Sequence, residues 1–447
     1  MKRHEGEVAV IGLARSGVAA CRLLRRDGAK IYASDLRTTP ELEKAAAELR
    51  AEGCDVELGV HDAVRIGYAR LVVASPGVPP DSFPLRMAAE HGVPVISEMD
   101  LAAQHLKHSR LIVTTGTKGK STTASMIAAI LAANSLGPAE VAGNIGTPLS
   151  DVALEESPPP WLSVEASSFQ LHDSPHLSPA VGVLTNLSAD HLDRYKSVAE
   201  YYADKKLMFR NASLRSRWVT NGDDQAVVGL SDGVVGGHER FSLDVALADA
   251  WFDRSGGWLI LRGMPLMRRA DLHLLGEHNV ANALAAALAV PPDESDRDRI
   301  AEALKGFRAL HHRLEPVREV GGVLWVNDSK ATTVSSAASA VQAMDRPVVL
   351  LLGGKDKGGD FKDLAPALRG ARGVIAYGEA GERVKRELNG SARVTLEGSD
   401  FEKVLSRARA MAQAGDVVLL SPACSSFDMF ENAEQRGDIF TKWVQSL

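Results

Sequence analysis

Cysteine is rare in this sequence, with only Cys21, Cys54 and Cys424 among 447 residues. The three are far apart and odd in number, so they show neither a disulfide framework nor the closely spaced pairs that bind metals. A small secreted scaffold held by disulfides is thereby excluded, and a reducing cytoplasm is favoured.

Long apolar runs are also missing, because no stretch reaches the roughly 18 apolar residues that a membrane-spanning helix needs. The first residues lead into a short apolar run that Arg15 interrupts, unlike the apolar core of a signal peptide. We therefore expect a cytoplasmic protein without a membrane span.

The sequence also lacks an excess of basic residues over acidic ones. The chain has 51 lysines and arginines against 57 aspartates and glutamates, which gives a net charge of −6. A general nucleic-acid binder would normally carry a basic face, so that class is not expected. A local basic pocket for phosphates stays open, because net charge does not describe a single cleft.

What the sequence does contain is an alternation of strands and helices. Hydrophobic residues make up 45% and charged residues 24%, as in ordinary globular proteins, and the chain is too long for one core. Strands that alternate with helices imply doubly wound, mostly parallel sheets. The pattern predicts three α/β units, at residues 1–98, 99–309 and 310–447.

The expected strands are residues 8–12, 29–34, 71–75, 93–97, 161–164, 181–185, 323–326, 348–352, 374–377 and 417–420, with one more beginning at Leu111. The expected helices are residues 16–27, 121–133, 201–209 and 281–290. Residues 234–261 are expected to form β-hairpins rather than core, and the charged run after Pro291 to form a surface turn.

A glycine-rich turn stands between an expected strand and an expected helix. Residues 115–122, Thr-Gly-Thr-Lys-Gly-Lys-Ser-Thr, are typical of a loop that cradles nucleotide phosphates, although Thr114 stands where the usual pattern begins with glycine. Backbone N–H groups and the helix N-terminus would face the phosphates, Lys120 would reach the β and γ phosphates, and Ser121 would bind Mg²⁺. The predicted ATP-binding residues of this loop are Gly116, Thr117, Lys118, Gly119, Lys120, Ser121 and Thr122.

A second glycine motif lies at residues 12–17, with Asp35 at the end of the next expected strand. It resembles a dinucleotide fingerprint, but Ala14 replaces the glycine that lets a pyrophosphate approach closely. Since the other loop already accounts for ATP, a nucleotide-linked substrate is preferred here over NAD. A helix-capping turn without a ligand stays open.

Three further residues are placed by their position after expected strands. Glu165 ends an apolar run, so its carboxylate is expected at the sheet edge where a Mg²⁺ ligand would face the phosphate loop. His191 follows another strand, and Lys206 lies in an expected helix. By spacing alone, a capping histidine and a solvated surface lysine remain alternatives for these two.

The third unit carries polar or glycine-rich loops at three strand ends, residues 327–332, 353–359 and 421–427. Such loops line the ligand crevice of a parallel sheet, so we expect them to converge. Lys330 and Lys357, with the hydroxyls of Ser425 and Ser426, would suit a small dianionic substrate. Ordinary tight turns are the alternative.

Together these segments resemble the Mur ligases of peptidoglycan synthesis, and within them the D-glutamate-adding branch. The resemblance covers nearly the whole chain. Its markers are the phosphate loop, Glu-Ala-Ser-Ser-Phe-Gln-Leu at 165, Asn-Asp-Ser-Lys-Ala-Thr at 327 and Ser-Pro-Ala-Cys-Ser-Ser-Phe-Asp at 421.

The resemblance implies a Rossmann-like domain that binds a UDP-linked substrate, a central P-loop domain and a Rossmann-like C-terminal domain that binds an amino acid. The implied reaction joins D-glutamate to UDP-N-acetylmuramoyl-L-alanine through an acyl phosphate, with ATP and two Mg²⁺ ions. We expect a monomer.

The resemblance also implies roles for individual residues. Lys120, Glu165, His191 and Lys206 form the catalytic set; Ser121, Glu165 and His191 bind Mg²⁺, as does Lys206 after carbamylation. ATP contacts are implied for Asn279, Asn282, Arg313 and Asp328, UDP-substrate contacts for Arg15, Ser16, Asp35, Arg37, Ser75 and Asn144, and D-glutamate contacts for Lys330, Thr332, Lys357 and Ser426.

Four positions depart from the pattern of the family. Ala166 and Thr333 replace residues common in relatives, and Arg15 is charged where relatives are often apolar. Ala433 stands where some relatives have an aromatic residue near the glutamate pocket. That change is harmless if only the backbone contributes there, and it weakens glutamate affinity if the ring packs on the substrate.

Rival interpretations explain less of the sequence. A folylpolyglutamate synthetase and the meso-diaminopimelate-adding ligase are the nearest, but the latter's expected Asp-Asn-Pro-Arg motif is absent. An NAD-dependent dehydrogenase would rest on residues 12–17 alone and leave Lys120 unexplained. A non-catalytic relative would be expected to lose Lys120, Glu165 or His191, and all three are present.

Overall fold

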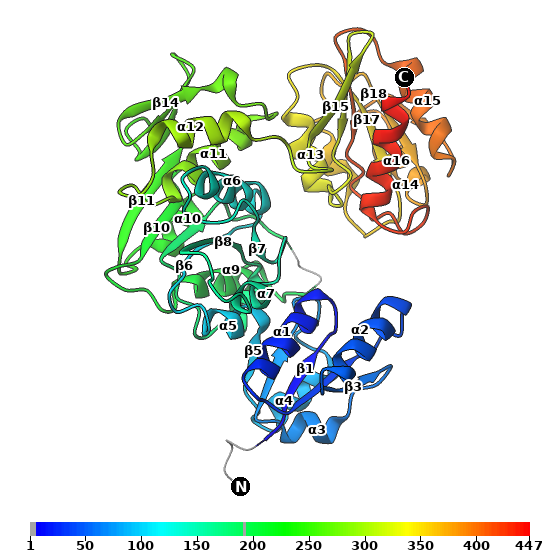
Figure 1. The fold of residues 1–447 in the computed structure, drawn as a ribbon. Coiled ribbons are helices and arrows are strands. Elements are labelled where there is room, and N and C mark those ends of the chain that lie inside the picture. Colours follow the sequence, from blue (N-terminus) through cyan, green and yellow to red (C-terminus); the bar gives the residue numbers. More distant parts are fainter. Residues whose placement is uncertain (1–5, 191–193) are drawn as a thin grey trace. The chain divides into compact units, whose positions relative to one another are not determined.

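The computed structural model describes residues 6–190 and 194–447, which form two compact units. The first unit comprises Met1–Leu272 with Val280–Gly306, and the second comprises His273–Asn279 with Phe307–Leu447. Two sheets lie in the first unit and one in the second (Figure 1). The expected α/β class with mostly parallel sheets is therefore confirmed.

The first sheet is parallel, in the order β3-β2-β1-β4-β5. Its strands are β1 (Val8–Ile11), β2 (Ile31–Asp35), β3 (Asp55–Leu58), β4 (Leu71–Ala74) and β5 (Val95–Ser97), and its helices are α1 (Arg15–Arg26), α2 (Pro40–Ala51), α3 (Ala63–Tyr68), α4 (Phe83–Glu90) and α5 (Glu98–Ala103). Val8 and Val10 pack with α1 and α2, whereas Ala9 and Ile11 pack with α3 and α4. The strand order reverses at β1, so the loop after β1 lies at a ligand-binding switch point.

The second sheet has nine strands in the order β14-β13-β12-β11-β10-β9-β6-β8-β7. The strands are β6 (Arg110–Thr115), β7 (Ala142–Gly143), β8 (Trp161–Glu165), β9 (Val181–Leu184), β10 (Arg217–Asn221), β11 (Gly237–Ser242), β12 (Ala250–Asp253), β13 (Trp258–Leu261) and β14 (Met264–Arg268). The helices between and after them are α6 (Lys120–Ala133), α7 (Leu149–Ala153), α8 (Ser168–His172), α9 (Val198–Lys206), η1 (Leu207–Phe209), α10 (Gln225–Ser231), η2 (Arg269–Asp271), α11 (Glu277–Ala289) and α12 (Arg297–Gly306).

The expectation of hairpins over residues 234–261 is wrong in part. β11 continues the parallel sheet beside β10, and only β12, β13 and β14 pair in antiparallel fashion. The first four residues of β11 are polar or glycine and not buried, and only Phe241 and Ser242 enter the core. The strand therefore lacks the apolar run by which a parallel strand is recognised.

The first two sheets share one hydrophobic cluster, which includes Val73 and Ile96 of the first sheet and Val113 and Val164 of the second. Polar contacts at α5 reinforce this junction. Glu98 accepts a hydrogen bond from the Ser150 backbone N–H (2.6 Å), and burial raises the pKa of Glu98 to about 7.

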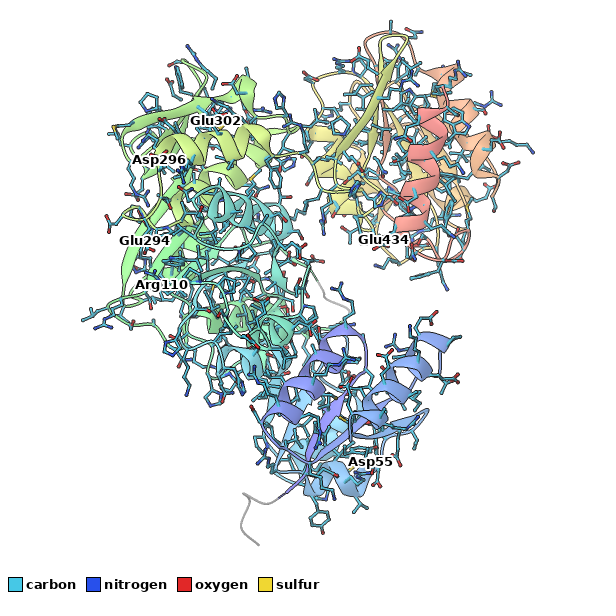
Figure 2. All side chains as sticks on the ribbon, in the orientation of Figure 1. Asp55, Arg110, Glu294, Asp296, Glu302 and Glu434 are labelled. Carbon is cyan, nitrogen blue, oxygen red and sulfur yellow. The ribbon has the colours of Figure 1, made fainter. Side chains whose placement is uncertain are left out.

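The turn after α11 packs back on the second sheet. Arg110, at the start of β6, pairs with Glu294 at 2.8 Å, and the Trp161 indole N–H donates to the same carboxylate at 3.1 Å (Figure 2). An exposed ion pair contributes little stability by itself. Its position nevertheless places the turn inside the first unit, as the sequence predicted.

The third sheet forms the core of the second unit, in the order β15-β16-β20-β17-β18-β19. Its strands are β15 (Glu315–Val320), β16 (Val323–Asn327), β17 (Val348–Gly353), β18 (Gly373–Tyr377), β19 (Val394–Leu396) and β20 (Val417–Leu420), and its helices are α13 (Val334–Gln342), η3 (Phe361–Leu364), α14 (Gly381–Glu387), α15 (Phe401–Met411) and α16 (Ala433–Gln445). Leu350 and Leu352 face α13 and α14, whereas Val349 and Leu351 face α15 and α16. Only the edge strand β15 is antiparallel.

Over the described ranges 6–190 and 194–447, no helix is long and apolar enough to cross a membrane.

Candidate active site

The glycine-rich turn leaves β6 at Thr115 and enters α6 at Lys120. Gly116 has φ +143°, and a Cβ there would lie 2.0 Å from the Thr185 hydroxyl oxygen. Gly119 has φ +80°, and a Cβ there would lie 2.4 Å from the Asn282 side-chain oxygen. Both positions require glycine because of backbone conformation and close packing together.

The shape of this loop is fixed by the residues that follow β9. The Thr117 N–H donates to the Asn186 carbonyl and the Lys118 N–H donates to the Asn186 side-chain oxygen, both at 2.9 Å. The Thr185 hydroxyl donates to the Lys118 carbonyl at 2.7 Å. Thr185 and Asn186 are thus functional residues that the sequence did not single out, because they support the loop from another strand.

The start of α6 presents the groups expected to bind phosphate. The amides of a helix's first turn point out from its N-terminus and carry partial positive charge. Ser121 is buried in that turn, Thr122 is half-buried beside it, and the Lys120 ammonium lies over the loop, donating to the Thr117 carbonyl at 2.8 Å. Burial lowers the pKa of Lys118 in the same loop.

Glu165 lies at the end of β8, directly across the sheet from Thr114 of β6. Its side chain is 1% exposed; Oε1 accepts a hydrogen bond from the Asn144 amide at 2.8 Å, and Oε2 has no hydrogen-bond partner among the described residues. A buried carboxylate oxygen without a partner is costly unless a cation compensates it. Asn144 thus orients Glu165, and its expected contact with the UDP-linked substrate stays a prediction.

The lysine that faces the phosphate loop is Lys205 and not Lys206. Lys205 is 1% exposed, and its ammonium donates to the Gly116 carbonyl at 2.7 Å, whereas Lys206 is exposed. Neighbouring helical residues point about 100° apart, so a shift of one position moves a side chain from the site to solvent. The expectation of a carbamate on Lys206 does not fit this geometry.

Burial lowers the pKa of Lys205 well below its ordinary value, and the nearby charge of Lys120 lowers it further, while Asp190 and Glu165 oppose this effect. Lys205 therefore lies close enough to Lys120 of the phosphate loop and to Glu165 for their charges to change its pKa. It joins the site as the neighbour of Lys206, the residue to which the family resemblance assigned the carbamate.

The predicted metal ligands are only partly visible. Ser121 and Glu165 lie at the phosphate loop, and His191 lies outside the described residues. Within residues 6–190 and 194–447, no three or more His, Cys, Asp and Glu side chains gather as a metal-binding group.

Asn279 and Asn282 are both buried, but they have different surroundings. Asn282 accepts a hydrogen bond from the Thr123 hydroxyl at 3.1 Å and so lies at the start of α6. Asn279 belongs to the second unit, where its amide donates to the Leu275 carbonyl at 2.8 Å.

A cavity of about 450 Å³ lies beside α1 in the first unit. Arg15 and Arg37, both expected to hold the UDP-linked substrate, line it together with Leu13 and Arg22. Its volume suits a small ligand, and its guanidinium groups favour an anionic one.

Asp35 anchors the edge of this cavity by pairing with Arg37 at 3.0 Å and accepting from the Leu13 N–H at 2.9 Å. Burial alone would raise the pKa of Asp35, but the hydrogen bonds from Arg37 and Leu13 outweigh burial and lower it. Ser16, the second residue of α1, is half-buried, and the structure assigns it no contact with the cavity.

The glycines near β1 have a packing role. A Cβ on Gly17 would lie 1.8 Å from the Gly12 carbonyl oxygen, and that oxygen accepts a hydrogen bond from the Ser75 hydroxyl at 2.7 Å. Ser75 thus holds the backbone of the loop that follows β1. The fingerprint-like spacing is explained by close backbone packing, without a dinucleotide.

In the second unit, Arg436 joins two of the three expected loops. It is 0% exposed, and its guanidinium donates to the Ser329 hydroxyl and carbonyl at 3.0 and 2.9 Å. It also donates to the carbonyls of Cys424 at 3.3 Å and Ser425 at 3.4 Å. The sequence did not single out Arg436, because nothing near it in the chain marks it as buried.

The predicted glutamate-binding residues lie on these loops. Ser426 is buried, Thr332 is half-buried and Lys357 is exposed, while Lys330 forms an ion pair with Glu434 at the start of α16 (Figure 2). The third loop is joined to the others where the Lys355 N–H donates to the Ser425 carbonyl at 2.9 Å. The expected convergence of the three loops is therefore present.

The residues expected to reach ATP from this unit surround a buried acid. Asp328 accepts from the Ser421 hydroxyl at 2.8 Å and from the Leu314 N–H at 3.2 Å, and burial raises its pKa to about 7. Arg313 stands beside it between two residues of positive φ, His312 (63°) and Leu314 (45°). Ala433 contributes its backbone carbonyl, which accepts from the Ser329 hydroxyl at 2.7 Å.

Comparison with known proteins links these features to one family. The family model of the MurD-like N-terminal domain of Mur ligases matches residues 6–97, that of the Mur ligase middle domain matches residues 114–290, and that of the Mur ligase glutamate ligase domain matches residues 312–424. The boundaries near 98 and 310 stay predictions.

Curated relatives match over nearly their whole length. A UDP-N-acetylmuramoylalanine–D-glutamate ligase from Salinibacter ruber is 41% identical, covering 98% of this chain and 97% of the relative, and one from Acidobacterium capsulatum is 37% identical, covering 98% and 96%.

Solved structures share the fold at lower identity. The UDP-N-acetylmuramate–alanine ligase from Thermotoga maritima has a TM-score of 0.62 at 21% identity, covering 98% of this chain and 99% of that one. The MurF ligase from the same organism, in complex with ADP, has a TM-score of 0.60 at 16% identity, covering 100% and 99%. The matched models span most of the chain, and with the full-length relatives they show that this chain belongs to the Mur ligase family.

Proposed function

We propose that this chain is the ATP-dependent ligase that adds D-glutamate to UDP-N-acetylmuramoyl-L-alanine in peptidoglycan precursor synthesis. The observation that carries the proposal is the pairing of the phosphate loop with Glu165, whose buried Oε2 has no partner in the described chain. The names of the full-length relatives supply the substrates.

The residues at the loop fit Mg²⁺. Glu165 and the Ser121 hydroxyl are oxygen donors of the kind that Mg²⁺ accepts, and the buried Glu165 Oε2 has no hydrogen-bond partner among the described residues. When bound, Mg²⁺ neutralises phosphate charge and polarises the γ-phosphoryl group. His191 remains a proposed third ligand.

Lys205 is the residue that we propose for carbamylation in place of Lys206. A lowered pKa favours the neutral amine of a buried lysine, and the neutral amine attacks CO₂ to form a carbamate with loss of one proton. The product is an anion near Lys120 and the proposed Mg²⁺ site. It would supply an oxygen ligand where the amine supplies none.

The first chemical step brings two anions together. Lys120 and the amides at the start of α6 neutralise the ATP phosphates, so the alanyl carboxylate can attack the γ-phosphorus and displace ADP. The product is an acyl phosphate. Asn279, Asn282, Arg313 and Asp328 stay predicted ATP contacts.

In the second step the neutral amine of D-glutamate attacks the acyl carbonyl and expels phosphate through a tetrahedral intermediate. The amine loses its proton as the amide forms. Lys330, Thr332, Lys357 and Ser426 are proposed to hold the carboxylates of D-glutamate, since their cationic and hydroxyl groups suit a dianion. Arg15 and Arg37 are proposed to hold the UDP part of the substrate at the cavity beside α1. The residues proposed to orient the UDP part, or the residues around it, are Asp35, Ser16, Ser75 and Asn144.

An ADP-release assay with each substrate left out in turn tests this function. ADP should form only when ATP, UDP-N-acetylmuramoyl-L-alanine and an amino acid are all present, and D-glutamate should be preferred over L-glutamate, L-alanine and meso-diaminopimelate. ADP formation that does not depend on the UDP substrate and D-glutamate would contradict the proposal.

A further inference from the structure

Residues 354–360, between β17 and η3, carry Lys357 away from the sheet. The start of this segment is tied down, because the Gly354 N–H donates to the Tyr377 carbonyl at 3.2 Å and the Lys355 N–H to the Ser425 carbonyl at 2.9 Å. From Lys357 to Asp360 the chain is exposed and includes two consecutive glycines. Such a stretch is costly to order unless other groups hold it.

Arg383 of α14 holds the segment on both sides of Lys357. One terminal nitrogen pairs with Asp356 at 2.6 Å, and the other donates to the Gly359 carbonyl at 2.7 Å. Asp356 also accepts from the Gly358 N–H at 2.8 Å, which closes a tight turn around Lys357. The residues before and after Lys357 are thus fixed to one side chain.

Glu387 fixes Arg383 in turn. The Arg383 Nε donates to Glu387 at 2.6 Å, and Glu387 accepts from the Phe361 N–H at 3.0 Å, so the far end of the segment joins the same network. The Arg383 guanidinium lies 5.2 Å from the centre of the Phe361 ring. Burial alone would raise the pKa of Asp356, but the Arg383 hydrogen bond and the Gly358 N–H lower it, so the pair stays ionised at neutral pH.

We propose that Arg383 is a positioning residue that sets the affinity for the amino-acid substrate by holding Lys357 in place. The inference rests on the proposed function, in which Lys357 contacts a carboxylate of D-glutamate. An isolated exposed pair would matter little, but this guanidinium joins three acceptors on two segments. Holding the turn before binding spares the substrate the cost of ordering it.

Steady-state kinetics of Arg383→Ala test the inference. The KM for D-glutamate should rise about tenfold, while kcat and the KM values for ATP and the UDP substrate stay within twofold of the unchanged protein. Arg383→Lys should show an intermediate rise, because an ammonium cannot span the three acceptors in a fixed plane. Arg386→Ala is the matched control, since it removes the same charge from an exposed position of α14 and should leave all constants unchanged.

A double variant separates positioning from general damage. If Arg383 acts through Lys357, Arg383→Ala should add less than twofold to the KM for D-glutamate in a Lys357→Ala background. A full additional tenfold there, or an unchanged KM in Arg383→Ala alone, would overturn the inference. So would a lowered melting temperature with every KM unchanged, because that outcome indicates a role in stability only.

The same data distinguish this inference from the proposed function. A KM for D-glutamate that Lys357→Ala does not change would contradict the amino-acid site itself. A KM that Lys357→Ala raises and Arg383→Ala leaves alone contradicts only the positioning role.

Discussion

The phosphate loop and the loops proposed to bind the amino acid are built differently. The phosphate loop is one contiguous stretch that contains the required glycines and the helix start, and Asn186 holds it through three hydrogen bonds. The amino-acid loops come from three strand ends, and Arg436 joins Ser329 to Cys424 from a position 107 residues beyond Ser329. The phosphate loop is therefore recognisable from one local pattern, although distant residues support its shape, whereas the proposed amino-acid site depends throughout on packing between separate segments.

This difference explains why a motif predicts ATP more directly than it predicts the second substrate. Backbone amides recognise any polyphosphate, so a short pattern of small residues is enough. Selecting one small dianion requires side chains held at fixed distances, and those distances depend on buried residues outside the motif. Four experiments test this difference between the two parts of the molecule.

The largest effect is expected for Lys120→Ala in the phosphate loop. Loss of the cation that faces the transferred phosphoryl group should lower kcat on the order of 10³-fold, or about 4 kcal/mol of transition-state stabilisation. The thermal midpoint should hardly change, because Thr185 and Asn186 also hold the loop. ADP release and differential scanning calorimetry measure the two quantities, and a large fall in thermal midpoint would show that Lys120 is needed for the shape of the loop.

The next effect concerns stability in the second unit. Arg436→Met should lower the free energy of unfolding of that unit by about 3 kcal/mol, because buried carbonyls of both loops lose their donor. Hydrogen exchange of the β17 and β20 amides reports this unit separately from the first. Arg409→Met, at an exposed position of α15, is the control. Equal protection of the amides in both variants would show that Arg436 does not stabilise the second unit.

A third experiment compares the neighbours Lys205 and Lys206. Lys205→Ala should lower kcat about 10²-fold, and short-chain carboxylic acids that replace a carbamate should restore part of it. The kcat of Lys206→Ala should stay close to that of the unsubstituted protein. The reverse pattern would restore the expectation that the family resemblance gave for Lys206. Loss in Lys205→Ala without any recovery would count against carbamate chemistry.

The smallest effect, expressed per pH unit, concerns the pH dependence of stability. Glu98 in the first unit and Asp328 in the second each have a pKa raised to about 7 by burial. Because the folded state keeps these protons at higher pH than the unfolded state, stability should fall as pH rises between about 4 and 7, by at most about 1.4 kcal/mol per pH unit for each group. Glu98→Gln should reduce this slope in the first unit and Asp328→Asn in the second, as measured by hydrogen exchange at pH 5 and pH 8. A slope that neither variant changes would assign the pH dependence to other groups.

Much of the fold could be predicted from the sequence, because buried parallel strands such as 348–352 and 417–420 are continuous apolar runs. β11 and β15 could not, because their residues are largely polar and only the neighbouring strand makes them strands. In the candidate site, the strand-end positions of Glu165 and Ser426 were predictable, whereas the choice between Lys205 and Lys206 was not.

By itself the sequence determined the α/β class, the phosphate loop and the family resemblance, because all three are written in local patterns of apolar, glycine and charged residues. Only the tertiary structure decided which lysine faces that loop, since helix phase depends on where α9 begins and on what it packs against. It also decided that Arg436 and Arg383 hold the loops of the second unit, because their acceptors include Ser329 and Asp356, which are distant from them in the chain.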